Sequence, residues 1–196
     1  MTKSRLEAFS DGVLAIIITI MVLELRAPET TDWEHIRHLL PELVSYVLSF
    51  AYVAIYWGNH HHLIHTVRKV NAKIIWANAH LLFWLSLVPF VTGWMGKTNF
   101  GQVTVAVYGL LMLICGGAYN ILNAVIRSGY ASETNLSKAL GKHRRKGFIS
   151  LVSYSAAAVL AFVHPYISYG IYLAVAVLWI IPDKDLERAV EEHQAG

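Results

Sequence analysis

The chain has 196 residues, of which 56% are hydrophobic and 15% charged, and its mean hydropathy is +0.47. Soluble domains carry about 25% charged residues, so this composition indicates a membrane protein rather than a soluble domain. The single cysteine, Cys115, excludes an internal disulfide. The net charge of +3 is modest, and we expect no nucleic-acid partner.

The first apolar segment, residues 5–25, opens with a polar cluster and then runs from Gly12 to Leu23 with no charge. Its one polar side chain within that run is Thr19. A helix from Arg5 to Arg26 would be about 33 Å long, enough to cross a hydrocarbon core of about 30 Å. No cleavage site of small residues follows the run, so we expect a retained membrane helix and not a signal peptide.

Five further apolar segments follow, and each is predicted to be a membrane helix. We expect them at residues 41–65, 74–95, 102–126, 147–163 and 166–181, separated by polar connections. Pro89 predicts a kink in the third helix, and His164-Pro165 predicts a tight turn before the sixth. The sequence therefore predicts an all-α protein, with one six-helix domain over residues 1–196.

The distribution of lysine and arginine predicts the orientation of these helices, because cytoplasmic loops carry an excess of both. One side collects most of the basic residues: Lys3, Arg5, Arg68, Lys69, Lys73, Arg127, the cluster at 138–146, Lys184 and Arg188. The other side has Arg26, Arg37 and Lys97. We therefore expect a multi-pass protein of the cell membrane with both termini in the cytoplasm.

The first helix carries one stripe of residues at helical spacing: Gly12, Ile16, Thr19, Ile20 and Leu23. Two interpretations stay open from spacing alone. In the first, the stripe is a lipid-facing or packed surface on which Thr19 bonds back to the Ala15 carbonyl. In the second, the stripe is a pore lining, because apolar rings gate by dewetting and rings of oxygen replace part of an ion's hydration shell.

The second helix ends in four histidines within six residues, His60, His61, His62 and His65. The i,i+3 and i,i+4 pairs among them could hold a metal, but no H-E-x-x-H pattern or nearby cysteine supports catalytic zinc. Buried polar groups need partners, so we predict instead a polar network that clamps the first three helices. Its expected members are Arg5, Ser10, Asp11, His61, His62, His65, Trp76 and Asn78.

The run Arg5-x-x-x-Phe9-Ser10-Asp11 at the start of the first helix resembles the R-x-x-x-F-S-D signature of the transmembrane-protein-175 family of potassium channels. The histidine-rich end of the second helix, and the six-helix length of the chain, are similar to prokaryotic members of that family.

The resemblance implies a homotetramer around a pore lined by the first helices, in membrane lipid, with potassium-selective leak of monovalent cations. It implies constriction residues at Ile16, Ile20 and Leu23, a hydroxyl layer at Thr19, and support from Arg5, Phe9, Ser10 and Asp11. Glu24 would attract cations to the outer mouth or serve the structure. We expect no enzyme activity, no cofactor and no bound metal, with K⁺ as the permeant ion.

Two other functions remain as alternatives. A histidine-based membrane metalloprotein would use His61 and His65 as ligands. A secondary transporter would need inverted repeats and broken helices, for which Pro89 and Gly116-Gly117 are the candidate breaks.

Overall fold

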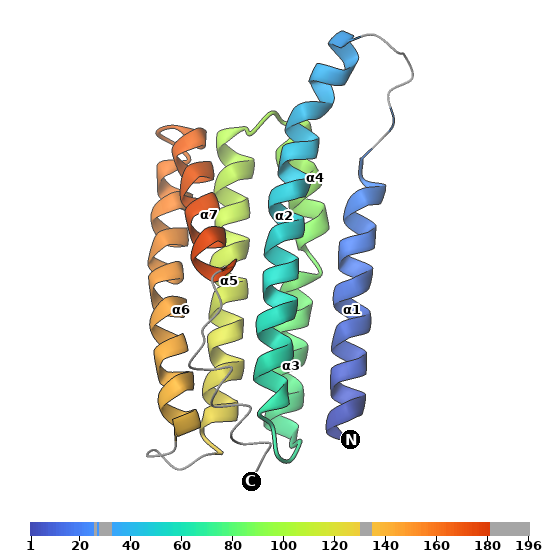
Figure 1. Cartoon of the computed structure of the whole chain (residues 1–196). Coiled ribbons are helices and arrows are strands. Elements are labelled where there is room, and N and C mark those ends of the chain that lie inside the picture. The colour runs from blue at the N-terminus through green and yellow to red at the C-terminus, as the bar shows by residue number, and fades with distance from the viewer. Residues whose placement is uncertain (26, 28–32, 130–134, 181–196) are drawn as a thin grey trace.

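Helices build nearly all of the chain that the computed structural model describes, which is residues 1–25, 27, 33–129 and 135–180. They are α1 (Lys3–Leu23), α2 (Trp33–His65), α3 (Ala72–Leu85), α4 (Val88–Lys97), α5 (Gln102–Arg127), α6 (Asn135–Leu160) and α7 (Pro165–Ile180) (Figure 1). No strand occurs in these ranges. The predicted all-α class is therefore confirmed.

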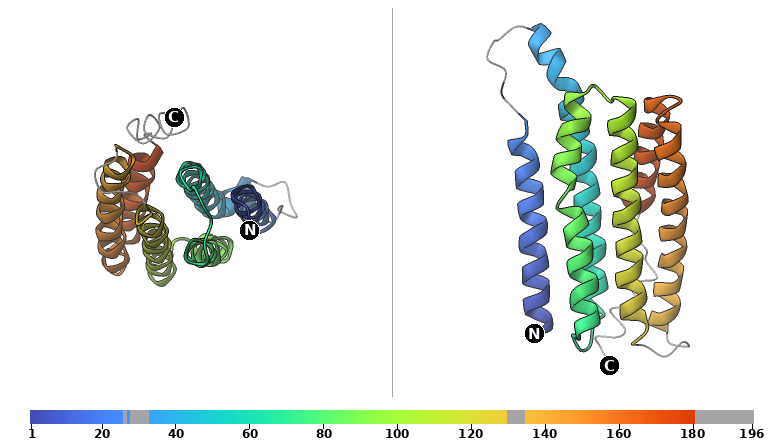
Figure 2. Two further views of the ribbon diagram at one scale, coloured as in Figure 1. Left: turned by 90° about the horizontal axis from the view of Figure 1, so that it is seen from below. Right: turned by 180° about the vertical axis from the view of Figure 1, so that it is seen from behind.

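The helices run alternately up and down, and α3 and α4 stack end to end as one rod (Figure 1). Within the described residues, four segments are long and apolar enough to cross a membrane: Lys3–Leu23, Leu39–His65, Ala72–Lys97 and Gln102–Arg127. Apolar α7 is shorter than a span of that kind. Viewed along the bundle, α1 lies at one edge and α6 with α7 at the opposite edge (Figure 2).

The rod of α3 and α4 breaks where Pro89 predicted a kink. Proline has no N–H to offer the carbonyl four residues earlier, which here belongs to Leu85, and α3 ends at that residue. Pro89 then occupies the first turn of α4, where the missing N–H is tolerated. The local sequence alone therefore explains this break.

Two predicted helix starts are wrong. The second helix begins at Trp33 and not at residue 41, so Pro41 lies inside it. Proline costs a helix one hydrogen bond, and here it does so near Leu39, where the candidate span begins and water can replace the lost partner. The fifth predicted helix begins at Asn135 and not at residue 147, because this stretch contains no proline and several strong helix formers.

Some residues used to predict orientation lie outside the described part of the chain. They are Arg26, Lys184 and Arg188, together with the side chains of residues 138–144.

Tyrosines from α2, α5 and α7 form the middle of the core. The Tyr52 hydroxyl donates to the Tyr172 carbonyl at 2.6 Å, and the Tyr172 hydroxyl donates to the Val105 carbonyl at 2.9 Å. A Cβ at Gly109 would come within 2.2 Å of the Tyr172 hydroxyl, so only glycine fits there. Because lipid offers no hydrogen bonds, these internal partners hold α2, α5 and α7 in register.

Candidate functional site: the outward face of α1

The two faces of α1 have different surroundings. Leu6, Leu14, Ile17 and Met21 are buried against the rest of the bundle, and Ser10 is buried with them. Opposite them, the predicted stripe of Gly12, Ile16, Thr19, Ile20 and Leu23 is exposed along its whole length. The exposed fractions of Ile16, Ile20 and Leu23 are 57%, 43% and 77%. This chain by itself therefore leaves its predicted constriction residues largely uncovered.

The Thr19 hydroxyl donates to the Ile16 carbonyl at 2.9 Å. The sequence interpretation had it bonding to Ala15, which is wrong by one residue. The donor is satisfied within α1, while the oxygen stays on the exposed face and can accept a further interaction. Thr19 is thus placed to present oxygen to water or to an ion.

A groove of about 620 Å³ runs beside the stripe, between α1 and the broken rod of α3 and α4. Ile16 and Ile20 lie in its wall, together with Pro89, Phe90 and Trp94. The stripe is therefore continuous with an apolar surface on α4, so that any partner covering one also reaches the other.

Glu24 closes the far end of the groove. Its carboxylate is 2.9 Å from the Lys97 ammonium, and both side chains are 45% exposed. The same carboxylate lies over Gly93, where an added Cβ would come within 3.3 Å of Glu24 Oε2. Since Lys97 compensates the charge, the structural role for Glu24 fits this geometry better than the attraction of cations.

The inner end of α1 is joined to α2 and α3 by a buried hydrogen-bond chain. His60 Nε2 donates to Asn78 Oδ1 at 2.6 Å, and the Asn78 amide donates to Ser10 Oγ at 2.9 Å. Ser10 in turn donates to the Leu6 carbonyl at 2.9 Å. The exposed fractions of His60, Asn78 and Ser10 do not exceed 2%. These three side chains therefore fix the rotation of α1 against its neighbours.

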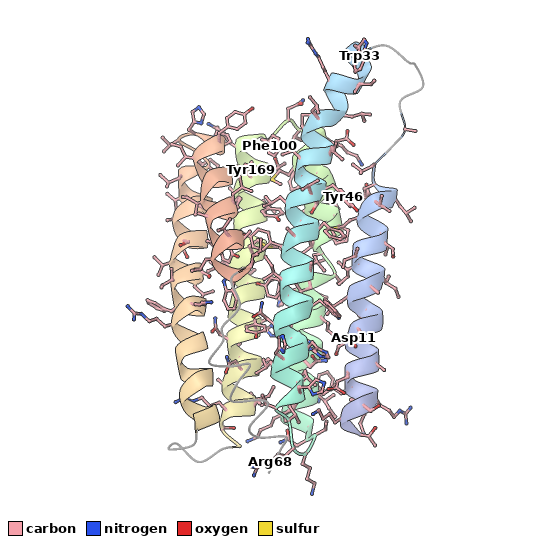
Figure 3. The ribbon with its side chains drawn as sticks, in the orientation of Figure 1. Asp11, Trp33, Tyr46, Arg68, Phe100 and Tyr169 are labelled. Atoms are coloured by element: carbon pink, nitrogen blue, oxygen red, sulfur yellow. The ribbon has the colours of Figure 1, made fainter. Side chains whose placement is uncertain are left out.

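A second, more accessible set of contacts surrounds the hydrogen bonds between His60, Asn78 and Ser10. The Trp57 indole donates to Asp11 Oδ1 at 3.0 Å. Asp11 lies on α1 (Figure 3). Lys3 donates to the His65 carbonyl at 2.6 Å, and His65 Nε2 lies 3.8 Å from Glu7 Oε1. The ring centroids of His61 and His65 lie 4.7 Å apart, with the ring planes tilted by 59°. Together these contacts line the seam between α1 and α2.

The structure thus brings together part of the predicted network. Ser10, Asp11, His61, His65 and Asn78 lie along the contacts of α1 with α2 and α3. Exposed side chains make up the rest: Arg5, Phe9, His62 and Trp76, with Phe9 at 57% and Trp76 at 75%. Among the described residues, no group of three His, Cys, Asp or Glu side chains is placed to hold a metal ion.

The predicted network left out two residues: His60, which joins α2 to Asn78 of α3, and Trp57, which joins α2 to Asp11 of α1. The sequence holds a signal for His60, because His60 lies on the same helix face as the apolar residues Val53, Leu63 and Ile64. All three are buried. That spacing separates it from His61 and His62 and predicts the inward position.

Comparison with known proteins agrees with this geometry. Residues 5–89 match the family model described as endosomal/lysosomal potassium channel TMEM175. A protein of Chryseobacterium sp. (strain P1-3), named a potassium channel, is 50% identical over 98% of this chain and 100% of its own length. Another named potassium channel, from Streptomyces collinus, is 29% identical over 82% of this chain and 83% of its own.

The fold is similar to a solved structure as well. The crystal structure of a lysosomal potassium-selective channel TMEM175 homolog from Chamaesiphon minutus superposes with a TM-score of 0.82 at 25% identity. The match covers 92% of this chain and 97% of that one. Near-complete coverage by a relative at 50% identity, together with this fold, leaves one assignment: the chain belongs to the TMEM175 family of potassium channels.

Proposed function

We propose that this chain is a passive potassium channel of the cell membrane, and that it works as a homotetramer whose α1 helices surround the pore. Its relatives of similar length are named potassium channels. Ile16, Ile20 and Leu23 form the constriction in this proposal, and Thr19 forms the layer of oxygens that contacts the ion. K⁺ is the permeant ion, and the basic end of the bundle, with Lys3, faces the cytoplasm.

The observation that carries the proposal is the edge position of α1. Viewed along the bundle, α1 lies at one edge (Figure 2). About 28% of its apolar span is buried inside the chain, the same share as in α2 and half that of α5, at 56%. A helix at the edge of its own bundle lines a pore only if further copies close around it. Since its open face is the one with Ile16, Thr19 and Ile20, association through this face produces one ring per residue.

Conduction follows from the order of these rings. An ion that enters between the helices loses part of its hydration shell, and the Thr19 oxygens replace some of the lost contacts. The branched side chains at Ile16 and Ile20 lie one helical turn apart and keep the passage narrow and dry. Potassium is favoured over sodium because it gives up its water more readily to a few weak oxygen ligands. No energy source is needed, since flux follows the gradient.

The test is accessibility to a thiol reagent in protein reconstituted into liposomes with a potassium gradient. Cys115 is fully buried, so replacing it by serine gives a background without a reactive thiol. Ile20→Cys should be blocked by a water-soluble thiol reagent, whereas Val22→Cys, on another side of α1, should keep its flux. Thr19→Ala should conduct with a lower potassium-over-sodium ratio. Equal block at both cysteines would contradict a pore along the stripe.

A further inference from the structure

A second cavity lies far from the stripe, where the turn between α2 and α3 meets the end of α5. Its volume is about 250 Å³. Val67, Ile74 and Ile126, each no more than 5% exposed, form its apolar floor. Arg68 and Lys69, both exposed, form its rim. Arg68 is at the end of the bundle, beyond the membrane-spanning part of α2 (Figure 3). The cavity is thus apolar inside and cationic at its mouth.

Several of the last carbonyls of α5, at one side of this cavity, accept hydrogen bonds from the chain itself. At the α5 end, Ser128 N donates to the Ala124 carbonyl and Gly129 N to the Ile126 carbonyl, each at 3.0 Å. The Ser128 hydroxyl donates to the Val125 carbonyl at 2.7 Å. These bonds engage carbonyls that otherwise give a helix C-terminus its negative character.

The α3 end contributes the opposite polarity. Asn71 caps the helix by accepting from Ile74 N at 3.0 Å, but a first turn leaves further amides without carbonyls inside the helix. In α3 these amides belong to Ala72 and Lys73. A helix N-terminus favours negative charge, so its field adds to that of Arg68 and Lys69. The mouth of the cavity is therefore suited to an anion with several oxygens.

We propose that this cavity binds the phosphate headgroup of an anionic phospholipid, with Arg68 and Lys69 on the phosphate and the apolar floor against the start of the lipid chains. The position supports a lipid rather than a free anion. The cavity lies where the span ending at His65 and the span beginning at Ala72 reach the membrane surface. A free phosphate would use the mouth alone and leave the floor of Val67, Ile74 and Ile126 empty. Basic pockets between membrane helices at this depth suit lipid headgroups.

The experiment measures lipid binding to the full chain by native mass spectrometry in detergent, with phosphatidylglycerol as the probe and phosphatidylcholine as the neutral comparison. A basic side chain near an anionic lipid contributes about fivefold in affinity, so Arg68→Gln with Lys69→Gln should weaken phosphatidylglycerol binding about 25-fold. Arg37→Gln with Arg145→Gln removes the same charge from exposed positions outside the lining. That pair should change the affinity less than about twofold.

If the variant with Arg68→Gln and Lys69→Gln does not fold, a second variant tests the same lipid site. Ser128→Trp adds a ring at the exposed α5 side of the cavity without changing any charge, and it should also abolish retention of phosphatidylglycerol. Equal loss in both charge pairs would overturn the site in favour of general surface attraction. Displacement of the lipid by millimolar inorganic phosphate would overturn the lipid assignment. Because binding is measured without ion flux, failure here leaves the proposed conduction pathway untouched.

Discussion

The helices α1 and α5 are alike in apolar composition and differ in their surroundings. Both are long, apolar and free of charge in the middle, yet α5 has Tyr108, Cys115 and Leu122 fully buried within the chain, whereas α1 leaves Ile16, Ile20 and Leu23 open. Lipid is as apolar as leucine, so hydrophobicity does not decide which helix packs where. The comparison teaches that a helix can be membrane-spanning by composition and still have its partners outside its own chain.

The largest expected effect on stability comes from creating a cavity beside α5. Leu122→Ala removes a side chain that is 0% exposed and should lower the free energy of unfolding by about 2–5 kcal/mol. Detergent unfolding followed by circular dichroism gives the measurement. Ile121→Ala, at a neighbouring position that is 50% exposed, is the control and should cost below about 0.5 kcal/mol. Equal losses at both positions would remove the distinction between buried and open helix faces.

The next effect concerns the hydrogen bonds that fasten α1. Asn78→Leu leaves His60 and Ser10 without their shared partner, and it should cost about 1–3 kcal/mol of stability. Combining it with His60→Leu should cost less than the two separate losses added together, because no polar group then stays buried and unpaired. The same unfolding assay measures this. Strict additivity would mean that the chain of hydrogen bonds does not act as one unit.

The open face of α1 is tested by adding polarity to it. Ile16→Asn places an amide at a proposed constriction and should raise potassium leak about tenfold, equivalent to about 1.4 kcal/mol off the barrier. Liposome flux under a potassium gradient gives the rate. Val22→Asn puts the same side chain on α1 away from the stripe and should leave the rate within about twofold. A similar rise in both variants would indicate a damaged bilayer seal.

The smallest effect is expected at the outer end of α1. Glu24→Gln breaks an ion pair that is nearly half exposed, and solvent screening limits its contribution to about 0.2–1 kcal/mol. Exchanging both charges, with Glu24→Lys and Lys97→Glu, should recover part of that stability in a double-mutant cycle. If the exchanged pair is no better than either single variant, the Glu24 carboxylate acts through its contact with Gly93 and not through its charge.

Local features of the sequence determined much of this protein. The apolar segments predicted the all-α class and the four segments that can cross a membrane, Pro89 predicted the break between α3 and α4, and the motif from Arg5 to Asp11 pointed to the family. The stripe on α1 was also readable, because residues on one helix face are fixed by the helical repeat alone. Each of these depends on residues that are close together in the chain.

Tertiary structure alone decided which side chains meet. Four histidines share one helix end, but only the rotation of α2 against α3 selects His60 for Asn78. The partner of Glu24 lies on α4, and the partner of Asp11 is Trp57 on α2. Such pairs depend on the relative rotation and depth of helices far apart in sequence, which packing of the whole bundle sets. For the same reason, only the packing of the other helices shows that this face of α1 is left uncovered within the chain.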